Sequence, residues 1–263
     1  MRVSPARLAT LLPTLVAGSV VAKTASSMST FAMPSRSLSR EEVRLVDERA
    51  IAMGLPGICL MENAALGLTD VVCDELAKRN AGPGAVVGIV TKTGNNGGDG
   101  FVLARQLLLR GYTPKVAYCG DRAVAKRDTD AGINLSVLES MAAADIVDVA
   151  DGAALTKVLA EWSDAILLVD CLYGTGLAAQ LRPDGVALVK ALDAAPQPKV
   201  ACDLPSGLDC DTGIPLGAAV KAVRTATFVG SKKGFDTAES APYTGEVTIV
   251  PIGCPPECWA HVT

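Results

Sequence analysis

The segment that says most about the fold reads Ala85-Val-Val-Gly-Ile-Val-Thr-Lys-Thr-Gly94-Asn-Asn-Gly-Gly-Asp-Gly100-Phe-Val-Leu-Ala-Arg-Gln-Leu-Leu-Leu-Arg110. Its first part, Ala85–Thr91, is almost entirely apolar and predicts a buried strand. Its last part, Asp99–Arg110, predicts a helix. The glycines between them permit positive φ and let a ligand approach the backbone. Asp99 is a candidate N-cap beside N–H groups that favour an anion, although a tight turn that binds nothing is the simpler interpretation.

The alternation of strand and helix continues on both sides of this segment. Upstream, Ser39-Arg-Glu-Glu42 matches a capping box, and Gly54 and Pro56 end the helix that it begins. Strands that alternate with helices predict an α/β fold with a mainly parallel sheet, here as a single domain over residues 39–255. Further helices are expected at Met61–Arg79, Thr129–Ala142, Ala153–Trp162 and Val186–Asp193, and further strands at Lys115–Cys119, Ala165–Asp170, Lys199–Asp203, Arg224–Val229 and Glu246–Val250.

Composition excludes several classes of protein. Of the 263 residues, 49% are hydrophobic, which argues against a disordered chain. The net charge of −4, without a cluster of Lys or Arg, gives no support for a nucleic-acid partner. A small anionic ligand remains compatible with this charge, because helix N-termini bind anions without a basic surface.

The two ends of the chain differ from the domain between them. Residues 1–38 contain Arg, Lys, Ser and Thr but no Asp or Glu, which is typical of a transit peptide to a mitochondrion or plastid. A secretory signal around Leu8–Ala22 and a disordered leader on a cytoplasmic protein are the alternatives. No segment predicts a membrane helix. Cys254 and Cys258 lack the second ligand pair of a zinc site, so we expect residues 256–263 to be a disordered tail with free thiols.

The glycine-rich loop invites comparison with the dinucleotide fingerprint G-x-G-x-x-G. Gly98 and Gly100 fit its first two positions, but Leu103 stands where the third glycine belongs. Asp121 lies near the distance expected for a ribose-binding carboxylate. A nicotinamide-dependent oxidoreductase is therefore disfavoured but stays an alternative.

Two further loops follow predicted strands and open with an aspartate. Asp170 precedes Gly174-Thr-Gly176, and Asp203 opens Asp203-Leu-Pro-Ser-Gly207. Asp170 could simply cap the turn that follows it. The sequence has no P-loop and no G-x-S-x-G elbow, and its only histidine is His261, so phosphoryl transfer and Ser-His-Asp hydrolysis lack support. The remaining carboxylates, amides, hydroxyls and Lys232 suit proton transfer and the binding of hard cations.

With these loops in view, the sequence resembles the NAD(P)H-hydrate epimerases from about Ser39 to Pro255. The resemblance rests on five motifs in their order and spacing, although Leu177–Pro183 is less typical of the family. These motifs are Met61-Glu-Asn-Ala64, Asn95-Asn-Gly-Gly-Asp-Gly-Phe-Val102, Asp170 with Gly174-Thr-Gly176, Asp203-Leu-Pro-Ser-Gly-Leu-Asp209 with Gly213, and Lys232.

The resemblance implies a Rossmann-like three-layer sandwich, a homodimer, and hydrated NADH or NADPH as substrate. It also implies one K⁺ per subunit, bound by Asn96, Asp170 and Ser206. A separate NAD(P)H-hydrate dehydratase is expected in the same pathway. The residues that it implies for substrate binding are Asn95, Asn96, Gly97, Gly98, Asp99, Gly174, Thr175, Gly176, Leu177, Ala178, Ala179, Gln180 and Asp203.

The implied reaction interconverts the R and S forms of the hydrated cofactor. The hydroxyl at C6 of the ring lies beside the ring nitrogen, so acid-assisted loss of hydroxide gives an iminium-like species, and water returns to either face. We expect Asp203 to be the acid/base and Lys232 to tune it electrostatically, with Asp99 as the competing proton carrier. The alternatives are a non-catalytic binding module of the same fold and an NAD-dependent oxidoreductase.

Overall fold

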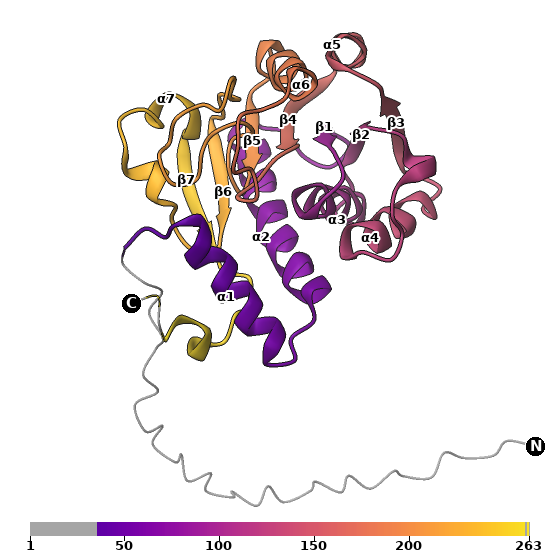
Figure 1. Ribbon diagram of the computed structural model, residues 1–263. Coiled ribbons are helices and arrows are strands. Elements are labelled where there is room, and N and C mark those ends of the chain that lie inside the picture. Colours follow the sequence, from indigo (N-terminus) through magenta and orange to yellow (C-terminus); the bar gives the residue numbers. More distant parts are fainter. Residues whose placement is uncertain (1–35, 261, 263) are drawn as a thin grey trace, which may run out of the picture. The chain divides into compact units, whose positions relative to one another are not determined.

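The computed structural model describes residues 36–260 and 262 (Figure 1). The leader predicted for residues 1–38 therefore lies almost wholly outside the described residues. Within the described part, no helix has both the length and the apolar character that a membrane crossing requires.

The core of the fold is one sheet of seven strands in the order β3-β2-β1-β4-β5-β6-β7, and every neighbouring pair is parallel. This confirms the α/β class and the parallel sheet. The order reverses between β1 and β4, because the chain leaves β1 toward one edge and later returns to build the other. The strands are β1 (Val86–Thr91), β2 (Thr113–Cys119), β3 (Asp145–Val149), β4 (Ala165–Cys171), β5 (Lys199–Cys202), β6 (Arg224–Phe228) and β7 (Glu246–Val250).

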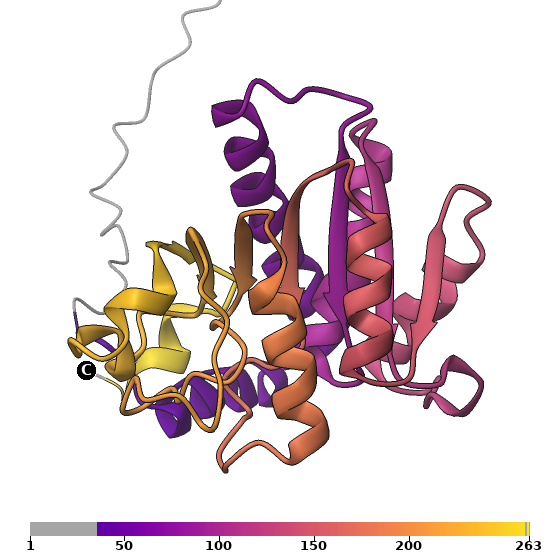
Figure 2. The same cartoon turned by 90° about the horizontal axis from the view of Figure 1, so that it is seen from above.

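Helices cover both faces of the sheet, which gives three layers (Figure 2). Helices α2, α3 and α4 pack side by side on one face, and α5 and α6 pack together on the other. The α-helices are α1 (Arg40–Ala52), α2 (Gly57–Lys78), α3 (Asn95–Leu109), α4 (Asp130–Glu139), α5 (Gly152–Glu161), α6 (Pro183–Ala194) and α7 (Ala241–Thr244), and the 3-10 helices are η1 (Arg122–Val124), η2 (Lys233–Asp236) and η3 (Pro256–Trp259).

Strand residues alternate between two buried apolar clusters. On β1, Ile89 belongs to the cluster beneath α2, α3 and α4, whereas Val90 belongs to the cluster beneath α5 and α6. Parallel strands covered on both faces need apolar residues at consecutive positions, which explains the unbroken run that predicted this strand.

The start of α1 follows the sequence prediction. The Ser39 side chain accepts from the Glu42 backbone N–H, and the Glu42 carboxylate accepts from the Ser39 N–H at 2.8 Å. Both halves of the capping box are thus present, and they satisfy two backbone donors at the helix start.

Three sequence predictions need correction. We expected no strand between α4 and α5, but β3 lies there as the edge strand; its partly exposed residues lack the apolar run that marks a buried strand. Helix α3 begins at Asn95, four residues before the predicted start, because the glycines continue the helix instead of preceding it. The predicted disordered tail instead contains η3, whose Cys258 and Trp259 are buried in the core beside α1.

Candidate functional site

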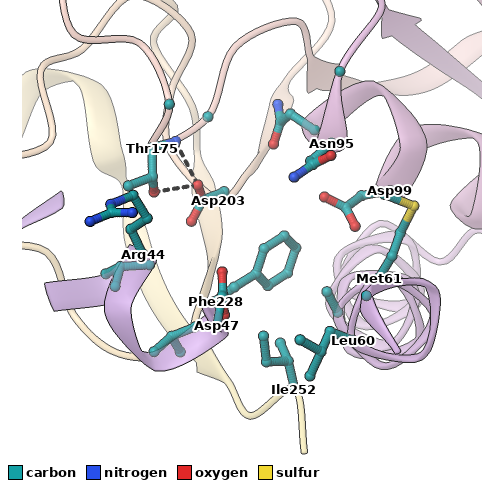
Figure 3. A pocket seen from close by; sticks show the side chains of 18 of the residues that line it. Arg44, Asp47, Leu60, Met61, Asn95, Asp99, Thr175, Asp203, Phe228 and Ile252 are labelled. Carbon is teal, nitrogen blue, oxygen red and sulfur yellow. Dashed lines mark hydrogen bonds between the residues drawn. The ribbon is translucent and has the colours of Figure 1, made fainter. Parts of the chain in front are cut away.

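A pocket, drawn from close by in Figure 3, opens beyond the carboxyl ends of β1, β4, β5 and β6, at the point where the strand order reverses. Ligands of open α/β sheets bind at such a point, because the loops after the two diverging strands separate there. Its volume is about 810 Å³, within the range of small-molecule sites. Its apolar lining includes Leu60, Met61, Phe228 and Ile252, and its acidic lining includes Asp47, Asp99 and Asp203.

Two of the strands that reach the pocket end in strained turns. Asp203 follows β5 with φ 66°, and Val229 follows β6 with φ 68°. In each turn the next residue donates its N–H back across the turn, Leu204 to Cys202 and Gly230 to Phe228. A positive φ is especially unfavourable for a β-branched residue such as valine, and such strain is typical of functional sites.

Asp203 is held in the ionised state. Burial raises the pKa of its carboxyl, but the Lys232 ammonium at 3.1 Å from Oδ1 and two hydrogen bonds from Thr175 lower the pKa below its usual value overall. The Thr175 N–H and hydroxyl donate to Oδ2 at 2.7 and 2.5 Å. Lys232 is fully buried and also donates to the carbonyls of Phe228 and Gly230. It lies behind Asp203, outside the pocket lining, so it acts on a ligand only through that carboxylate.

Asp99 is in the opposite state. It is buried, and burial followed by the negative charges of Asp203 and Asp47 raises its pKa well above the usual value. Its one hydrogen-bond donor within the described residues is the Cys202 thiol at 3.9 Å. The sequence predicted Asp99 at the helix start, but it lies in the second turn of α3, and the N-cap is Gly94. Asp99 therefore keeps its proton to a higher pH than Asp203 does, and it lines the pocket.

Asp47 is the functional candidate that the sequence analysis missed. It projects from α1 into the pocket, and its buried Oδ1 makes no hydrogen bond to the described part of the chain. Burial and the charge of Asp203 raise the pKa of Asp47 to about 6, against the opposing influence of Lys232. The apolar spacing of Val43, Val46 and Ala50 predicted that α1 would pack on the domain, but it did not indicate that Asp47 would face a cavity.

The start of α3 supplies backbone donors beside the pocket. Gly98 donates its N–H to the Gly94 carbonyl, so the N–H groups of Asn95, Asn96 and Gly97 precede the first helical bond. Gly97 and Gly98 do not line the pocket. A Cβ on Gly97 would lie 1.6 Å from the Lys92 carbonyl oxygen, so these glycines allow the helix to start directly against the strand.

Of the three residues implied for potassium, Asn96 lines the pocket, whereas Asp170 and Ser206 lie outside its lining. Ser206 donates its hydroxyl to Asp170 at 2.5 Å and its N–H at 2.7 Å. Burial raises the pKa of Asp170 to about 6, although these hydrogen bonds lower it. Both polar atoms of the Asn96 side chain are buried and lack hydrogen-bond partners in the described chain. The described residues contain no group of three or more His, Cys, Asp or Glu side chains that could hold a metal.

The loop after β4 is divided between the pocket and the surface. Gly174, Thr175, Gly176 and Leu177 line the pocket. Arg40 at the start of α1 holds this part of the loop, because its guanidinium donates to the carbonyls of Thr175 and Leu177 at 2.9 Å. The other residues predicted to contact substrate are exposed and do not line the pocket, and these are Ala178, Ala179 and Gln180.

Comparisons with known proteins agree with this architecture. The crystal structure of yeast ynu0 superposes with a TM-score of 0.68 at 22% identity, over 81% of this chain and 87% of that one, and supports the fold. The NAD(P)H-hydrate epimerase of Pirellula staleyi is 36% identical over 84% of this chain and 93% of its own. The corresponding enzyme of Limosilactobacillus fermentum is 30% identical over 82% and 97%.

Longer relatives match as well. The bifunctional NAD(P)H-hydrate repair enzyme Nnr of Pyrobaculum aerophilum is 35% identical over 84% of this chain, which spans 42% of that enzyme's length. The profile described as YjeF-related protein N-terminus matches residues 57–234, from the start of α2 to η2. This segment includes the pocket loops after β1, β4, β5 and β6, and the chain belongs to the YjeF-related protein N-terminus family.

Proposed function

We propose that this chain is an NAD(P)H-hydrate epimerase that interconverts the R and S forms of hydrated NADH and NADPH in cofactor repair. Relatives of nearly the same length carry this name. The observation that carries the proposal is the pairing, at one pocket, of Asp99, whose pKa is raised, with Asp203, whose pKa is lowered. Two carboxyl groups with opposite shifts in pKa can serve as acid and base at the same pH.

Asp99 and Asp203 have different roles in the proposed reaction, one as proton donor and the other as proton acceptor. Asp99 donates its proton to the C6 hydroxyl, which leaves as water while the ring nitrogen lone pair forms the iminium. Asp203 accepts a proton from a water molecule that adds to the other face of C6. The substrate and product have the same composition, and the proton that Asp99 lost is balanced by the one that Asp203 gained. In the reverse direction the roles exchange.

The surroundings of the two carboxyl groups suit this chemistry. Lys232 keeps Asp203 ionised until the water is deprotonated, and Thr175 fixes the direction of its carboxylate. The apolar side chains of Leu60, Phe228 and Ile252 offer the ring a surface with little water. In such surroundings, charges fixed before the reaction stabilise the transition state more than they would in water.

A potassium ion fits the group formed by Asn96, Asp170 and Ser206. These residues offer an amide oxygen, a carboxylate and a hydroxyl, which are hard oxygen ligands, and the orphaned Asn96 side chain needs a partner. The ion supplies a fixed positive charge that orders the loops after β1, β4 and β5. We further propose a homodimer with one ion per subunit, a mitochondrial or plastid transit peptide, and a separate NAD(P)H-hydrate dehydratase in the same pathway.

A chiral assay tests the function. Purified protein is mixed with either separated epimer of hydrated NADH, and the approach to equilibrium is followed by chiral chromatography, with the spontaneous rate subtracted. We expect faster interconversion and no change in the redox state of the ring. Hydride transfer would support the oxidoreductase alternative. Binding of the hydrate without any acceleration would support the binding module.

A further inference from the structure

A second cavity lies on the other side of the loop that joins β1 to α3. Its volume is about 480 Å³, and it opens beyond the carboxyl end of β2. The roles proposed above do not use it. Its lining comes from the loop after β1, from residues that follow β2, such as Asp121 and Val124, and from α4.

The two cavities meet at the start of α3. Thr93, Gly94 and Asn95 line both of them. Gly94 has φ 106°, and a Cβ at this position would meet nothing within 4 Å, so the space above it is open. The N–H groups before the first helical bond of α3 lie at this junction. A ligand that extends from one cavity to the other therefore passes a row of backbone donors midway.

The second cavity combines apolar walls with charged side chains, which are Asp121, Lys92 and Lys126. Its apolar lining includes Val124 of η1, Ala125 directly after it, and Ala131 and Leu135 of α4. Asp121 accepts from the Ala123 N–H through Oδ1 at 2.8 Å, and a carboxylate has a second oxygen that can accept from a ribose hydroxyl. Apolar walls with a few polar groups are typical of a site for a flat heteroaromatic ligand.

We propose that this second cavity binds the adenosine half of the dinucleotide substrate, with the pyrophosphate at the start of α3 and the hydrated nicotinamide in the first cavity. The proposal rests on the proposed function for the identity of the ligand. Asp121 at the end of β2 receives the ribose, as an acidic residue at that place does in dinucleotide-binding sheets with this strand order. Lys126 lines the same cavity, as does Lys92, and supplies a cation for a 2′-phosphate, so both NADH and NADPH hydrates are accommodated.

A competing path for the adenosine runs along the loop after β4. Residues 178–180 on that path are exposed and belong to neither cavity. An adenine placed there would stay in water and gain little from burial, whereas the second cavity removes its faces from water. The geometry therefore favours the cavity at β2.

The test compares substrates that do and do not carry adenosine. Hydrated nicotinamide mononucleotide fills only the first cavity, whereas hydrated NADH fills both. Val124→Asp introduces a charge into the wall of the second cavity at an exposed position, 78% accessible, where folding tolerates it. Ala123→Asp places the same charge on the same turn but outside the cavity lining, and it is the matched control. Asp121→Asn retains the turn but removes the ribose-binding charge.

We expect Val124→Asp to raise KM for hydrated NADH about tenfold or more, the usual effect of one lost pocket contact. Its kcat should change little, because the lost contact is equal in ground and transition states. Turnover of the mononucleotide hydrate should not change, and Ala123→Asp should resemble the wild type with both substrates. Equal effects on the two substrates, or no effect on either, would overturn the proposal. The proposal would also be overturned if Ala178→Asp, and not Val124→Asp, removed the preference for hydrated NADH over the mononucleotide hydrate.

A binding measurement separates this proposal from the proposed function. If the wild type turns over neither hydrate, the epimerase function fails, and calorimetric titration with ADP-ribose still tests the cavity. We expect Val124→Asp to weaken ADP-ribose at least tenfold and Ala123→Asp to leave it unchanged. Equal affinity in all three proteins, or no affinity in the wild type, would overturn the second cavity as an adenosine site.

Discussion

Replacing Asp47 by Asn should stabilise the folded protein at neutral pH. The carboxyl group of Asp47 has a pKa of about 6, compared with an ordinary value of 3.8, because it is desolvated and lies near Asp203. Asn has nearly the same shape and never ionises. The variant therefore removes an unfavourable buried charge and keeps the packing of α1.

Proton linkage gives the sign and the size of this change in the free energy of unfolding. Between pH 4 and 6 the folded protein binds more protons at this residue than the unfolded chain, so the stability of the wild type falls as pH rises through that window. One pH unit of difference in pKa corresponds to about 1.36 kcal/mol, which sets an upper limit of about 3 kcal/mol for Asp47. Because Asp47 is only half-buried, water screens part of this effect. We expect the variant to be about 1.5–3 kcal/mol more stable above pH 7 and equal to the wild type below pH 4.

Urea unfolding at pH 4 and pH 7.5, monitored by circular dichroism, measures this difference in the free energy of unfolding. Glu48→Gln is the control, because Glu48 is exposed on the same helix and its surface ion pair with Arg44 should contribute less than about 1 kcal/mol. A gain for Asp47→Asn that is the same at both pH values would refute the reasoning, as would no gain at pH 7.5. Turnover should fall in the stabilised variant if the charge of Asp47 serves the reaction.

Four other perturbations test the site and its packing. Asp203→Asn should lower kcat in the chiral assay by about 10²-fold or more with little change in substrate affinity, whereas near-normal turnover would remove Asp203 as a proton carrier. In the same assay, wild-type activity should decline as pH rises through the raised pKa of Asp99, and Asp99→Asn should abolish that decline along with most activity. Dialysis against a chelator of divalent metals should leave activity intact and replacement of K⁺ by Na⁺ should lower it; activity restored by zinc would contradict the site. Gly97→Ala should destabilise the fold by about 1–3 kcal/mol or more in thermal unfolding, since its Cβ would overlap the Lys92 carbonyl, and an unchanged midpoint would contradict the packing described.

Patterns along the sequence were sufficient to predict the fold. Central strands such as β1 and β4 appear as apolar runs, whereas the partly exposed edge strand β3 does not, and the capping box at Ser39 predicts the start of α1 within one residue. The start of α3 was misplaced because glycines usually interrupt helices, and here they continue one. Only the contact between Gly97 and the Lys92 carbonyl explains why glycine is needed at that position, and that contact depends on tertiary structure.

The site was predicted in part. The rule that ligands lie beyond the carboxyl ends of strands brought Asp203 and Asp99 together, because both were close to such ends. Asp47 was missed because it comes from a helix outside the alternating pattern, and a single aspartate among charged neighbours on α1 looks like part of a solvated face. The pKa shifts of the pocket carboxyl groups could not be predicted from the sequence either, because they depend on burial and on charges that are distant along the chain.

The charges of the pocket explain how it can favour the reaction without binding the ground state too tightly. Asp203 and Lys232 offset one another, the raised pKa of Asp99 favours its protonated form, and Asp47 with a pKa of about 6 is mainly ionised at neutral pH. The hydrated ring is uncharged and gains little from the remaining negative charge. When the C6 hydroxyl takes the proton of Asp99 and leaves as water, the ring becomes a cation as Asp99 becomes an anion. Attraction between these charges, and between the ring and Asp47, arises only as the C6–oxygen bond breaks, and interactions of that kind accelerate the chemical step.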